Sequence, residues 1–439
     1  MGGDLYLLPA VLVETKLDMT SASFLDHKGR PRVAVTGLGL VTPAGDVPDI
    51  NWKQLLSGES VAAPLDRFDP RIIGKDHLAA CQINGFDPMP YMSARDIRQS
   101  DLFAQYALVA AVKALQHAGT PSDKGRVHAV VSASAAAATE SWSTQPAVFH
   151  GGGPARVAAM TIPLLMPNAP AQLVARLTGR NGPCLSVGTS SASGTTVIGE
   201  GARLIRDGSC DTVLAGASEA PIVPVMVAGL ARLGTLSSHP SPSLASRPFD
   251  LDRDGLVLSE GAAFLHLERM DHALSRGAEV LAEIGGYAQT CDAYHLTAPH
   301  PSGVDAAACI TAAVKDAGLT PPDIGFVKAH GTSTKLNDLT EAVALRLAFP
   351  EGPPPVTAPK GVFGHSLGAA GAIEAVTAVL ALQHRTIPPV ANHSTADPQI
   401  DLDIVTRPRP FQPAPVLCNS FGFGGHNACL ILTPPTNCR

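Results

Sequence analysis

The sequence lacks an excess of positive charge. Its 439 residues carry 32 lysine and arginine side chains against 38 aspartate and glutamate side chains, a net charge of −6. Proteins that bind nucleic acid or anionic membranes usually present a basic patch or stripe, and the sequence contains none. We therefore expect no direct contact with nucleic acid or membrane, and small molecules or other proteins as partners.

Paired cysteines and long apolar runs are also missing. The eight cysteines are scattered without C-x-x-C spacing, which argues against a disulfide framework and against a metal site. No uninterrupted apolar stretch approaches the ~20 residues that span a bilayer. Residues 1–30 show neither the basic lead-in nor the small-residue cleavage site of a signal peptide. The sequence therefore predicts a cytoplasmic protein.

What the sequence does contain is 45% hydrophobic residues, enough for a large core. Residues 1–31 have no steady periodicity and are expected to be a poorly ordered or loosely packed extension, with Met19 as a possible initiator. After them, β-branched runs alternate with alanine-rich segments, which predicts an α/β fold. The expected strands are 32–43, 126–133, 184–189, 211–216, 279–290 and 324–331, and the expected helices are 170–179, 194–207, 303–319, 337–347 and 368–385.

A strand-to-helix turn with reactive residues occurs once in each half of the chain. This recurrence predicts two related halves that face each other, residues 32–275 and 276–439. In the first half, "CLSVGTSSASG" ends a buried strand and opens a helix near Ser191. The free N–H groups and the dipole of that helix would stabilise an anion at Ser191. A helix cap with tightly packed small residues would explain the same stretch.

Two histidines stand in glycine-rich turns of the second half, His330 in "KAHGTST" and His365 in "KGVFGHSLGAAG". Each follows an apolar run, and the small residues beside it would let a substrate approach closely. Four charged residues accompany them: Lys360, Glu374, Asp338 and Glu341. They could orient the imidazoles or pair the lysine, and an ordinary salt-bridged surface would explain them equally well.

Three further glycine-rich motifs need weighing. "NSFGFGGHN" places glycines around Phe423, which suggests a backbone close to a ligand and an aromatic ring that can swing. "GHSLG" matches the G-x-S-x-G elbow of serine hydrolases with Ser366 as nucleophile, but only His393 and His426 could follow as bases. "GLGLVTPAG" has the wrong spacing for a dinucleotide fingerprint, and Pro43 would interrupt its helix.

Six motifs together resemble the elongating β-ketoacyl-acyl-carrier-protein synthases, the ketosynthases of fatty acid and type II polyketide biosynthesis. They are "VAVTGLGLVTPAG", "RPFDLDRDGLVLSEGAAFLHLE", "DAYHLTAPHP", "KAHGTSTKLND", "GHSLGAAGAIE" and "NSFGFGGHN", and the likeness runs from Arg32 to Pro434. It implies a thiolase-like fold, two similar halves in a five-layer α-β-α-β-α sandwich. It also implies a homodimer, or a heterodimer with a related ketosynthase or chain-length subunit. The substrates would be thioesters on the phosphopantetheine of an acidic acyl carrier protein, with no further cofactor.

The resemblance also assigns roles to individual residues. His330 and His365 match the histidines that hold the malonyl carbonyl, and Phe423 matches a gating phenylalanine. The backbone N–H of Phe423 would share an oxyanion hole with that of residue 191. Lys360 and Glu374 match the supporting lysine and glutamate. Further matches are the pantetheine-binding Thr332 and Thr334, and a segment whose apolar residues Ile162, Leu164, Leu165 and Met166 could set chain length, although core packing explains these equally well.

Ser191 occupies the position of the family's nucleophilic cysteine. A serine hydroxyl is a far weaker acid than a thiol and needs a base within ~3 Å, which His330 or His365 could supply. Three functions remain open: acyl transfer or condensation through Ser191, decarboxylation of malonyl-carrier protein without acyl loading, and a non-catalytic chain-length partner. The retained histidines, Lys360 and the Phe423 turn weigh against the third. A Cys-to-Ser replacement made to trap a substrate complex would leave the same residue.

Overall fold

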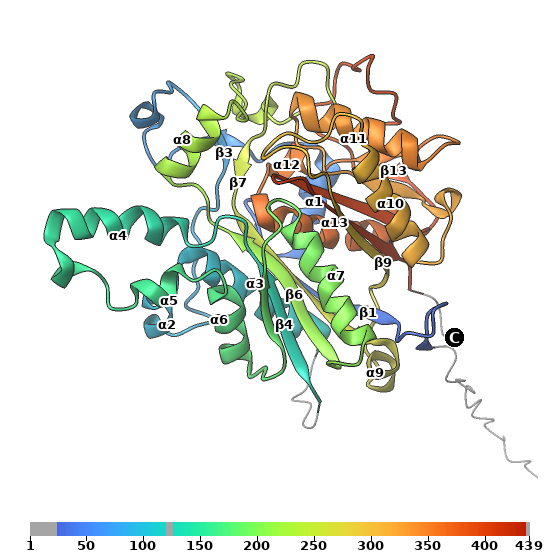
Figure 1. Ribbon diagram of the computed structural model, residues 1–439, viewed down its shortest axis with the longest axis horizontal. Helices are drawn as coiled ribbons and strands as arrows, with labels where there is room; N and C mark the ends of the chain where they lie inside the picture. Colours follow the sequence, from blue (N-terminus) through green and yellow to red (C-terminus); the bar gives the residue numbers. More distant parts are fainter. Residues whose placement is uncertain (1–23, 120–125, 436–439) are drawn as a thin grey trace, which may run out of the picture.

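The computed structural model describes residues 24–119 and 126–435. Its strands and helices alternate along the chain (Figure 1). The first half contains β1 (Val33–Val41), α1 (Pro48–Ser57), β2 (Ala63–Pro64), β3 (Ala79–Cys81), α2 (Ala94–Arg98), α3 (Leu102–Ala118), β4 (His128–Ala133), α4 (Thr139–Gly152), α5 (Thr161–Leu165), α6 (Ala169–Thr178), β5 (Cys184–Val187), α7 (Ser193–Arg206), β6 (Thr212–Glu219), α8 (Pro224–Arg232), β7 (Leu258–Ser259), β8 (Gly261–Arg269) and α9 (Met270–Ser275). The second half contains β9 (Ala282–Cys291), α10 (Val304–Asp316), β10 (Phe326–Lys328), α11 (Lys335–Ala348), β11 (Val356–Thr357), α12 (Lys360–Phe363), α13 (Ala370–His384), β12 (Thr386–Ile387), β13 (Arg409–Pro410), β14 (Val416–Gly422) and β15 (His426–Thr433).

The two halves repeat one strand arrangement. In the first half the spatial order is β5-β4-β6-β8-β1, with β4 parallel to β5 and β6, and β8 antiparallel to β6 and β1. In the second half the order is β11-β10-β14-β15-β9, and the parallel and antiparallel pairs fall at the same places. The predicted pair of similar α/β halves is therefore confirmed, while the boundary between residues 275 and 276 stays a prediction.

The two sets of strands are hydrogen-bonded to each other at one place. Ala34 and Val35 of β1 pair with Glu283 and Ala282 of β9, so that all ten strands form one continuous sheet. The two strand layers of the predicted sandwich are therefore joined at this edge. Because the junction is only two residue pairs long, each half still curves over its own side of the central helices.

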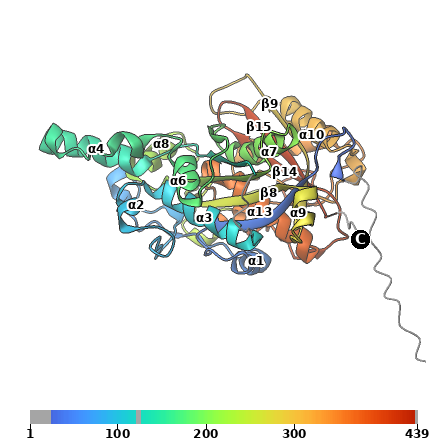
Figure 2. The same ribbon diagram turned by 90° about the horizontal axis from the view of Figure 1, so that it is seen from below.

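Helices α7 and α13 form the middle layer of the molecule. Both helices contact strands of both halves: α7 packs on β4, β6, β9 and β15, and α13 packs on β8, β1 and β14. Helix α3 covers the outer face of β1 and β8, and α10 covers the outer face of β9 and β15. The order of layers is thus α3, strands, α7 with α13, strands, α10, and Figure 2 shows α3 and α10 on opposite sides of the central helices. The predicted five-layer sandwich is confirmed.

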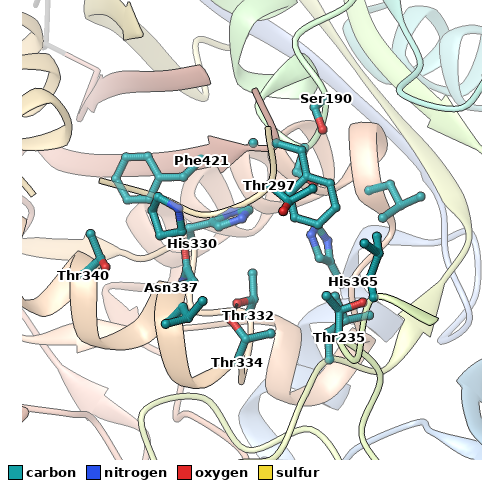
Figure 3. Close-up of a pocket in the computed structure, with 18 of the residues that line it drawn as sticks. Ser190, Thr235, Thr297, His330, Thr332, Thr334, Asn337, Thr340, His365 and Phe421 are labelled. Carbon is teal, nitrogen blue, oxygen red and sulfur yellow. Dashed lines mark hydrogen bonds between the residues drawn. The ribbon is translucent and has the colours of Figure 1, made fainter. Parts of the chain in front are cut away.

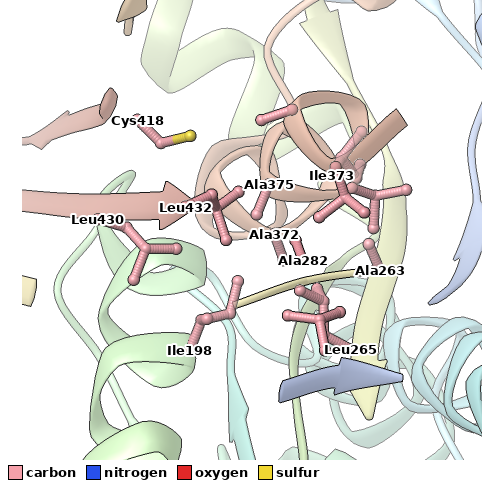
Figure 4. Close-up of a cluster of buried hydrophobic side chains, with 14 of the residues drawn as sticks. Ile198, Ala263, Leu265, Ala282, Ala372, Ile373, Ala375, Cys418, Leu430 and Leu432 are labelled. Carbon is pink, nitrogen blue, oxygen red and sulfur yellow. The ribbon is translucent and has the colours of Figure 1, made fainter. Parts of the chain in front are cut away.

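Small residues allow this middle layer to form. A Cβ on Gly194 of α7 would lie 2.3 Å from the backbone nitrogen of Ala372 in α13, so only glycine permits the two helices to approach so closely. Apolar side chains from both halves fill the space around them (Figure 4). Residues 367–384 are long and apolar enough to cross a membrane, but 83% of that window is buried in the protein. This segment is therefore a core helix.

One end of the first half is apolar and exposed. Strand β5 is an edge strand that pairs only with β4, and α4 projects away from the body in both views (Figures 1 and 2). Large apolar side chains are exposed on α4, on α5 and the residue after it, and on β5 itself: Trp142, Phe149, Ile162, Met166 and Leu185. Exposed large apolar side chains together with an open strand edge are typical of a protein interface.

The start of the described chain packs against the second half. Lys28 and Arg30 both form ion pairs with Asp316 at the end of α10, at 2.7 and 3.0 Å. Residues 24–31 of the predicted extension are therefore tied to the fold, and residues 1–23, including Met19, lie outside the described residues.

Candidate active site

The turn between β5 and α7 holds Ser191 at the start of the central helix. Ser190 has a φ of 53°, in the left-handed region that a non-glycine residue adopts rarely. The Ser193 hydroxyl stabilises this turn, because it donates to the carbonyl of Ser190 at 2.6 Å and accepts from the backbone N–H of Thr189 at 2.8 Å. Ser191 itself is 8% exposed. In the described chain its hydroxyl makes no hydrogen bond to another residue.

A cavity of about 610 Å³ brings the predicted residues together. Ser191, His330 and His365 all line it, although they come from distant parts of the sequence. Figure 3 shows Ser190 at one end of this pocket, the two histidines between, and Thr332 with Thr334 toward the other end. The cavity is thus an elongated site with the candidate nucleophile and both imidazoles on its walls.

The two histidines face each other inside the cavity. Their ring centroids lie 5.4 Å apart with the rings nearly perpendicular, and the side chains are 3% and 4% exposed. Burial, and then the positive charge of Lys360, lower the pKa of His330 and of His365 well below the ordinary value of 6.5. Both imidazoles are therefore neutral at neutral pH and can act as hydrogen-bond donors or as bases.

Lys360 fixes which nitrogen of His330 carries the proton. Its Nζ lies 3.2 Å from Nδ1 of His330, and it donates to the His330 carbonyl at 2.7 Å and to Glu374 at 2.5 Å. An ammonium group can only donate, so Nδ1 accepts and the proton of the neutral ring resides on Nε2. His330 is thereby held as an Nε2–H donor.

A second buried lysine completes this network. Lys328, which is 1% exposed, donates to the other oxygen of Glu374 at 2.6 Å and to the carbonyl of Asn419 at 2.6 Å. Glu374 thus accepts from two lysines. Sequence reasoning missed Lys328, although a lysine inside the apolar run "IGFVKAHG" is a signal, since such a charge must find a buried partner.

Asp338 and Glu341 hold the backbone of the His330 loop. Glu341 accepts the N–H groups of His330 and Gly331, both at 2.8 Å, and Asp338 accepts the N–H of Thr332 at 3.0 Å. Burial raises the pKa of Asp338 to about 6. Neither carboxylate contacts an imidazole ring or Lys360, so they do not orient the rings or pair the lysine directly. They set the position of the loop from which the ring projects.

His365 is held through its backbone. Its N–H donates to the carbonyl of Val257 at 2.7 Å, and its carbonyl accepts from Ser259 at 3.0 Å. The preceding Gly364 has a φ of 70°, and a Cβ there would lie 2.8 Å from Sγ of Cys81. The Nδ1 atom of His365 is buried and has no hydrogen-bond partner among the described residues.

Glu219, at the end of β6, connects both walls of the cavity. Its carboxylate accepts from the Ser134 hydroxyl, from the N–H of Ala136 at 3.2 Å and from the N–H of Gly368 at 3.3 Å. Burial raises the pKa of Glu219 to about 7. Because Ala136 lines the cavity and Gly368 follows the His365 turn, this residue joins the two halves at the site. The sequence reasoning did not identify it.

The Phe423 turn lies directly against the Ser191 turn. A Cβ on Gly422 would lie 2.7 Å from the carbonyl oxygen of Thr189 and 3.0 Å from the nitrogen of Ser191, so glycine is required for this approach. The backbone N–H groups of Ser191 and Phe423 have no hydrogen-bond partner in the described chain. Phe423 is 38% exposed and lines the cavity. Two free donors beside the serine are what an oxyanion hole needs.

Comparison with known proteins gives the family. The Beta-ketoacyl synthase N-terminal domain matches residues 30–273, and the Beta-ketoacyl synthase C-terminal domain matches residues 281–394. The chain belongs to the β-ketoacyl synthase family. The predicted family resemblance is thereby confirmed.

Among its relatives is a 3-oxoacyl-[acyl-carrier-protein] synthase 2 from Synechocystis sp., 37% identical over 91% of this chain and 97% of that protein. Its counterpart from Vibrio cholerae is 36% identical over 91% of this chain and 98% of that protein. Among solved structures, the ishigamide ketosynthase/chain length factor has a TM-score of 0.86 at 34% identity over 93% of this chain and all of that chain. A type II polyketide ketosynthase solved with its acyl-carrier protein has a TM-score of 0.85 at 31% identity, over 93% and 100% of the two chains.

Within this family framework, the predicted chain-length residues lie apart from the cavity. Ile162 in α5 is 71% exposed, and Leu165 packs beside the core formed by α3 and α6. Neither lines the cavity in the single chain. Their role in substrate binding stays a prediction, and it requires the exposed face of α5 to be covered by another chain.

The hydrolase alternative finds no support in the geometry of this ketosynthase chain. Ser366 is 4% exposed and does not line the cavity, and its hydroxyl has no hydrogen bond to His393 or His426. No group of three or more histidine, cysteine or acidic side chains in residues 24–119 and 126–435 is placed to hold a metal ion.

Proposed function

We propose that this member of the β-ketoacyl synthase family is an acyltransferase that acts on acyl-carrier-protein thioesters in fatty acid or type II polyketide biosynthesis. The observation that carries the proposal is the convergence of Ser191, His330 and His365 on one cavity, with the two rings 5.4 Å apart. The relatives named above are acyl-carrier-protein synthases, which supports carrier-bound substrates. The chain would work in the cytoplasm.

The histidines would drive the decarboxylation of a malonyl thioester. The Nε2–H of His330 donates to the thioester carbonyl oxygen, and a second donor from His365 would complete the pair. The bond between the carboxylate and the α-carbon breaks, carbon dioxide leaves, and the electron pair moves onto the carbonyl oxygen as an enolate. The two donors stabilise that negative charge, and neutral imidazoles are the right state for this role.

Ser191 would accept the acyl chain before condensation. Its oxygen attacks the thioester carbon, the pantetheine thiol leaves, and the N–H groups of Ser191 and Phe423 stabilise the oxyanion. The enolate then attacks the acyl carbon, a carbon–carbon bond forms, and the serine oxygen leaves and takes up a proton from solvent, because its own proton left with the pantetheine thiol. Lys360, Glu374, Asp338 and Glu341 would support the histidines in this scheme, and Thr332 with Thr334 would hold the pantetheine arm.

A second candidate function is decarboxylation without acyl loading. The observation that favours it is the Ser191 hydroxyl, which has no basic hydrogen-bond partner in the described chain. An alcohol without a base in contact is a poor nucleophile at neutral pH. The histidine pair does not depend on Ser191 for the loss of carbon dioxide.

A carrier protein and a second ketosynthase-type chain are the proposed partners. The open edge of β5 and the exposed apolar side chains of α4 and α5 would be covered by a homodimer partner or by a related chain-length subunit. Solved relatives that pair with a chain length factor or with an acyl-carrier protein support this reading.

Intact mass spectrometry after incubation with acyl-carrier protein separates the candidates. A mass gain that maps to the peptide of Ser191 and disappears in Ser191→Ala would support acyl transfer. Carbon dioxide released from malonyl-carrier protein without any adduct would support the decarboxylase. If neither occurs, and the chain co-purifies with a ketosynthase that carries a cysteine nucleophile, the proposal of an active enzyme is wrong.

A further inference from the structure

Among the described residues, the mouth of the cavity carries one unpaired cation, Lys335. This residue lines the cavity and is exposed, so it lies where the cavity meets solvent. It opens α11, directly after the two threonines whose hydroxyls are 2.8 Å apart. Within the described chain no carboxylate oxygen lies within 4.0 Å of its Nζ. An exposed lysine beside a cavity that holds polar hydroxyls is suited to contact the charged end of a ligand.

The other charged side chains of the cavity are satisfied by neutral donors. Asp254 accepts from Ser237 at 2.5 Å and from Ser238 at 2.9 Å. Asp292 accepts from the backbone of His300 and from the amide of Asn427, at 2.9 and 2.7 Å. Glu341 accepts backbone N–H groups as described above. Lys335 is therefore the one side chain of this set whose charge has no partner in the described residues.

The backbone at Lys335 is fixed by a buried arginine. Arg253, which is 4% exposed, donates to the carbonyl of Thr334 at 3.3 Å and to that of Lys335 at 3.4 Å. Arg253 is in turn paired with Asp397 at 2.7 Å. The backbone at the start of α11 is thus anchored. The ammonium group of Lys335 therefore moves only by rotation of its own side chain.

We propose that Lys335 binds the phosphate group of a phosphopantetheine-linked substrate and so selects substrates whose pantetheine arm is phosphorylated. This inference rests on the proposed function, which places a thioester near Ser191 and the arm along Thr332 and Thr334. A pantetheine arm carries no charge, and amides and hydroxyls are its polar groups, whereas a phosphate at the end remote from the thioester is charged. Lysine binds a phosphate as a point charge. Coenzyme A and a carrier protein both supply this chemistry.

The test compares ligands that differ only in the phosphate. Binding of non-hydrolysable acetyl-phosphopantetheine and acetyl-pantetheine amides is measured by calorimetry for the full chain and for Lys335→Gln, Lys335→Arg and Lys315→Gln. Lys315 is an exposed lysine of α10 that does not line the cavity, so its variant loses the same charge elsewhere. The wild type should prefer the phosphorylated ligand by about three- to fivefold, in keeping with a solvent-exposed ion pair.

Lys335→Gln should lose that preference while its affinity for the unphosphorylated ligand stays unchanged. Lys335→Arg and Lys315→Gln should keep it, and added salt should reduce it in the wild type. A preference that survives in Lys335→Gln, or a wild type that binds both ligands equally, would overturn the inference and leave the proposed function standing. A wild type that binds neither ligand would overturn both.

Two larger ligands identify the source of the phosphate. The same variants are measured with acetyl-coenzyme A and with acetyl-carrier protein. A weakening by Lys335→Gln of both shows a contact to the shared phosphate, and a weakening of only one shows which carrier places its phosphate at Lys335. Affinities for both that are unaffected by Lys335→Gln would contradict the inference.

Discussion

Nζ of Lys360 lies 3.2 Å from Nδ1 of His330, and both side chains are almost completely buried. This contact decides the protonation of the ring, because the ammonium occupies the acceptor nitrogen and leaves the proton on Nε2. Its positive charge also disfavours a second proton, which contributes to the lowered pKa of His330. Lys360 is thus a positioning residue that acts through the histidine.

Replacing Lys360 by methionine should therefore change the pH dependence of decarboxylation as well as its rate. The rate should fall by on the order of 10²-fold, the lower end of what a positioned acid–base group contributes. Without the neighbouring charge the pKa of His330 rises toward 6.5, so the acidic limb of the pH–rate profile moves to higher pH. The profile of carbon dioxide release from malonyl-carrier protein checks both effects.

Lys328→Met is the matched control for this variant. Lys328 also pairs with Glu374 and is equally buried, but it does not contact the ring of His330. Both variants leave Glu374 with one lysine and should lose comparable stability in thermal unfolding. If the two variants shift the acidic limb equally, Lys360 does not act through the Nδ1 contact.

Replacing Ser191 by cysteine should increase acyl loading and condensation. A thiol at a helix N-terminus ionises far more readily than an alcohol, and it needs no base in contact. We expect a gain on the order of 10²-fold in the rate of condensation, since that is what a missing general base costs. Single-turnover loading from acyl-carrier protein measures this. Equal loading by both proteins would show that the serine is already activated by a group that the resting geometry does not place in contact.

The sequence predicted the reactive residues of the site, but it did not predict all of the buried residues that hold them in place. Ser191 and His330 stand in short motifs that follow strand ends, and residues at such ends meet at one edge of an α/β fold. His365 stands in a glycine-rich motif that follows helix α12. Lys328 and Glu219 were not found, because each acquires its role only from partners far along the chain, Asn419 and Gly368. A local pattern can mark such a residue, as the lysine inside "IGFVKAHG" does, but it does not identify the partner.

Gly422→Ala should disturb the contact between the Phe423 turn and the Ser191 turn. The new methyl group would overlap the carbonyl of Thr189, and relieving the overlap costs about 1–3 kcal/mol or moves the Phe423 N–H away from residue 191. The rate of acyl loading should fall strongly, whereas the midpoint of thermal unfolding should fall only slightly. Gly229→Ala is the control, because a Cβ at that α8 position meets nothing within 4 Å. Loading that stays at the wild-type rate in Gly422→Ala would remove the turn from the oxyanion hole.

Glu219 should make stability depend on pH near neutrality. Its folded pKa of about 7 lies above the ordinary 4.5, so its contribution to stability is complete below pH 4.5 and is lost as pH rises through 7. That shift corresponds to about 3 kcal/mol. In urea unfolding, the free energy of unfolding of Glu219→Gln should therefore increase relative to that of the wild type as the pH rises from 5 to 8. For the exposed control Glu279→Gln, the difference in free energy of unfolding from the wild type should be the same at every pH. The same result for Glu219→Gln would contradict the assignment.

Hydrophobic patterns in the sequence predict the strands and helices correctly wherever long-range contacts do not alter the local structure. The strand expected at 324–331 shortens to Phe326–Lys328, because His330 and Gly331 leave the ladder and give their N–H groups to Glu341. The hydrogen bonds between β1 and β9 had no signal, since they join residues about 250 positions apart. The pairing of two edges is set by how both halves pack on α7 and α13, and no single segment contains that information.

The release of carbon dioxide from malonyl-carrier protein tests the central claim most directly, since both candidate functions require it of the histidine pair. The wild type and Ser191→Ala should release it at similar rates, and His330→Ala and His365→Ala should each be slower by on the order of 10²-fold. Release that persists in both histidine variants, or no release by the wild type, would contradict the account.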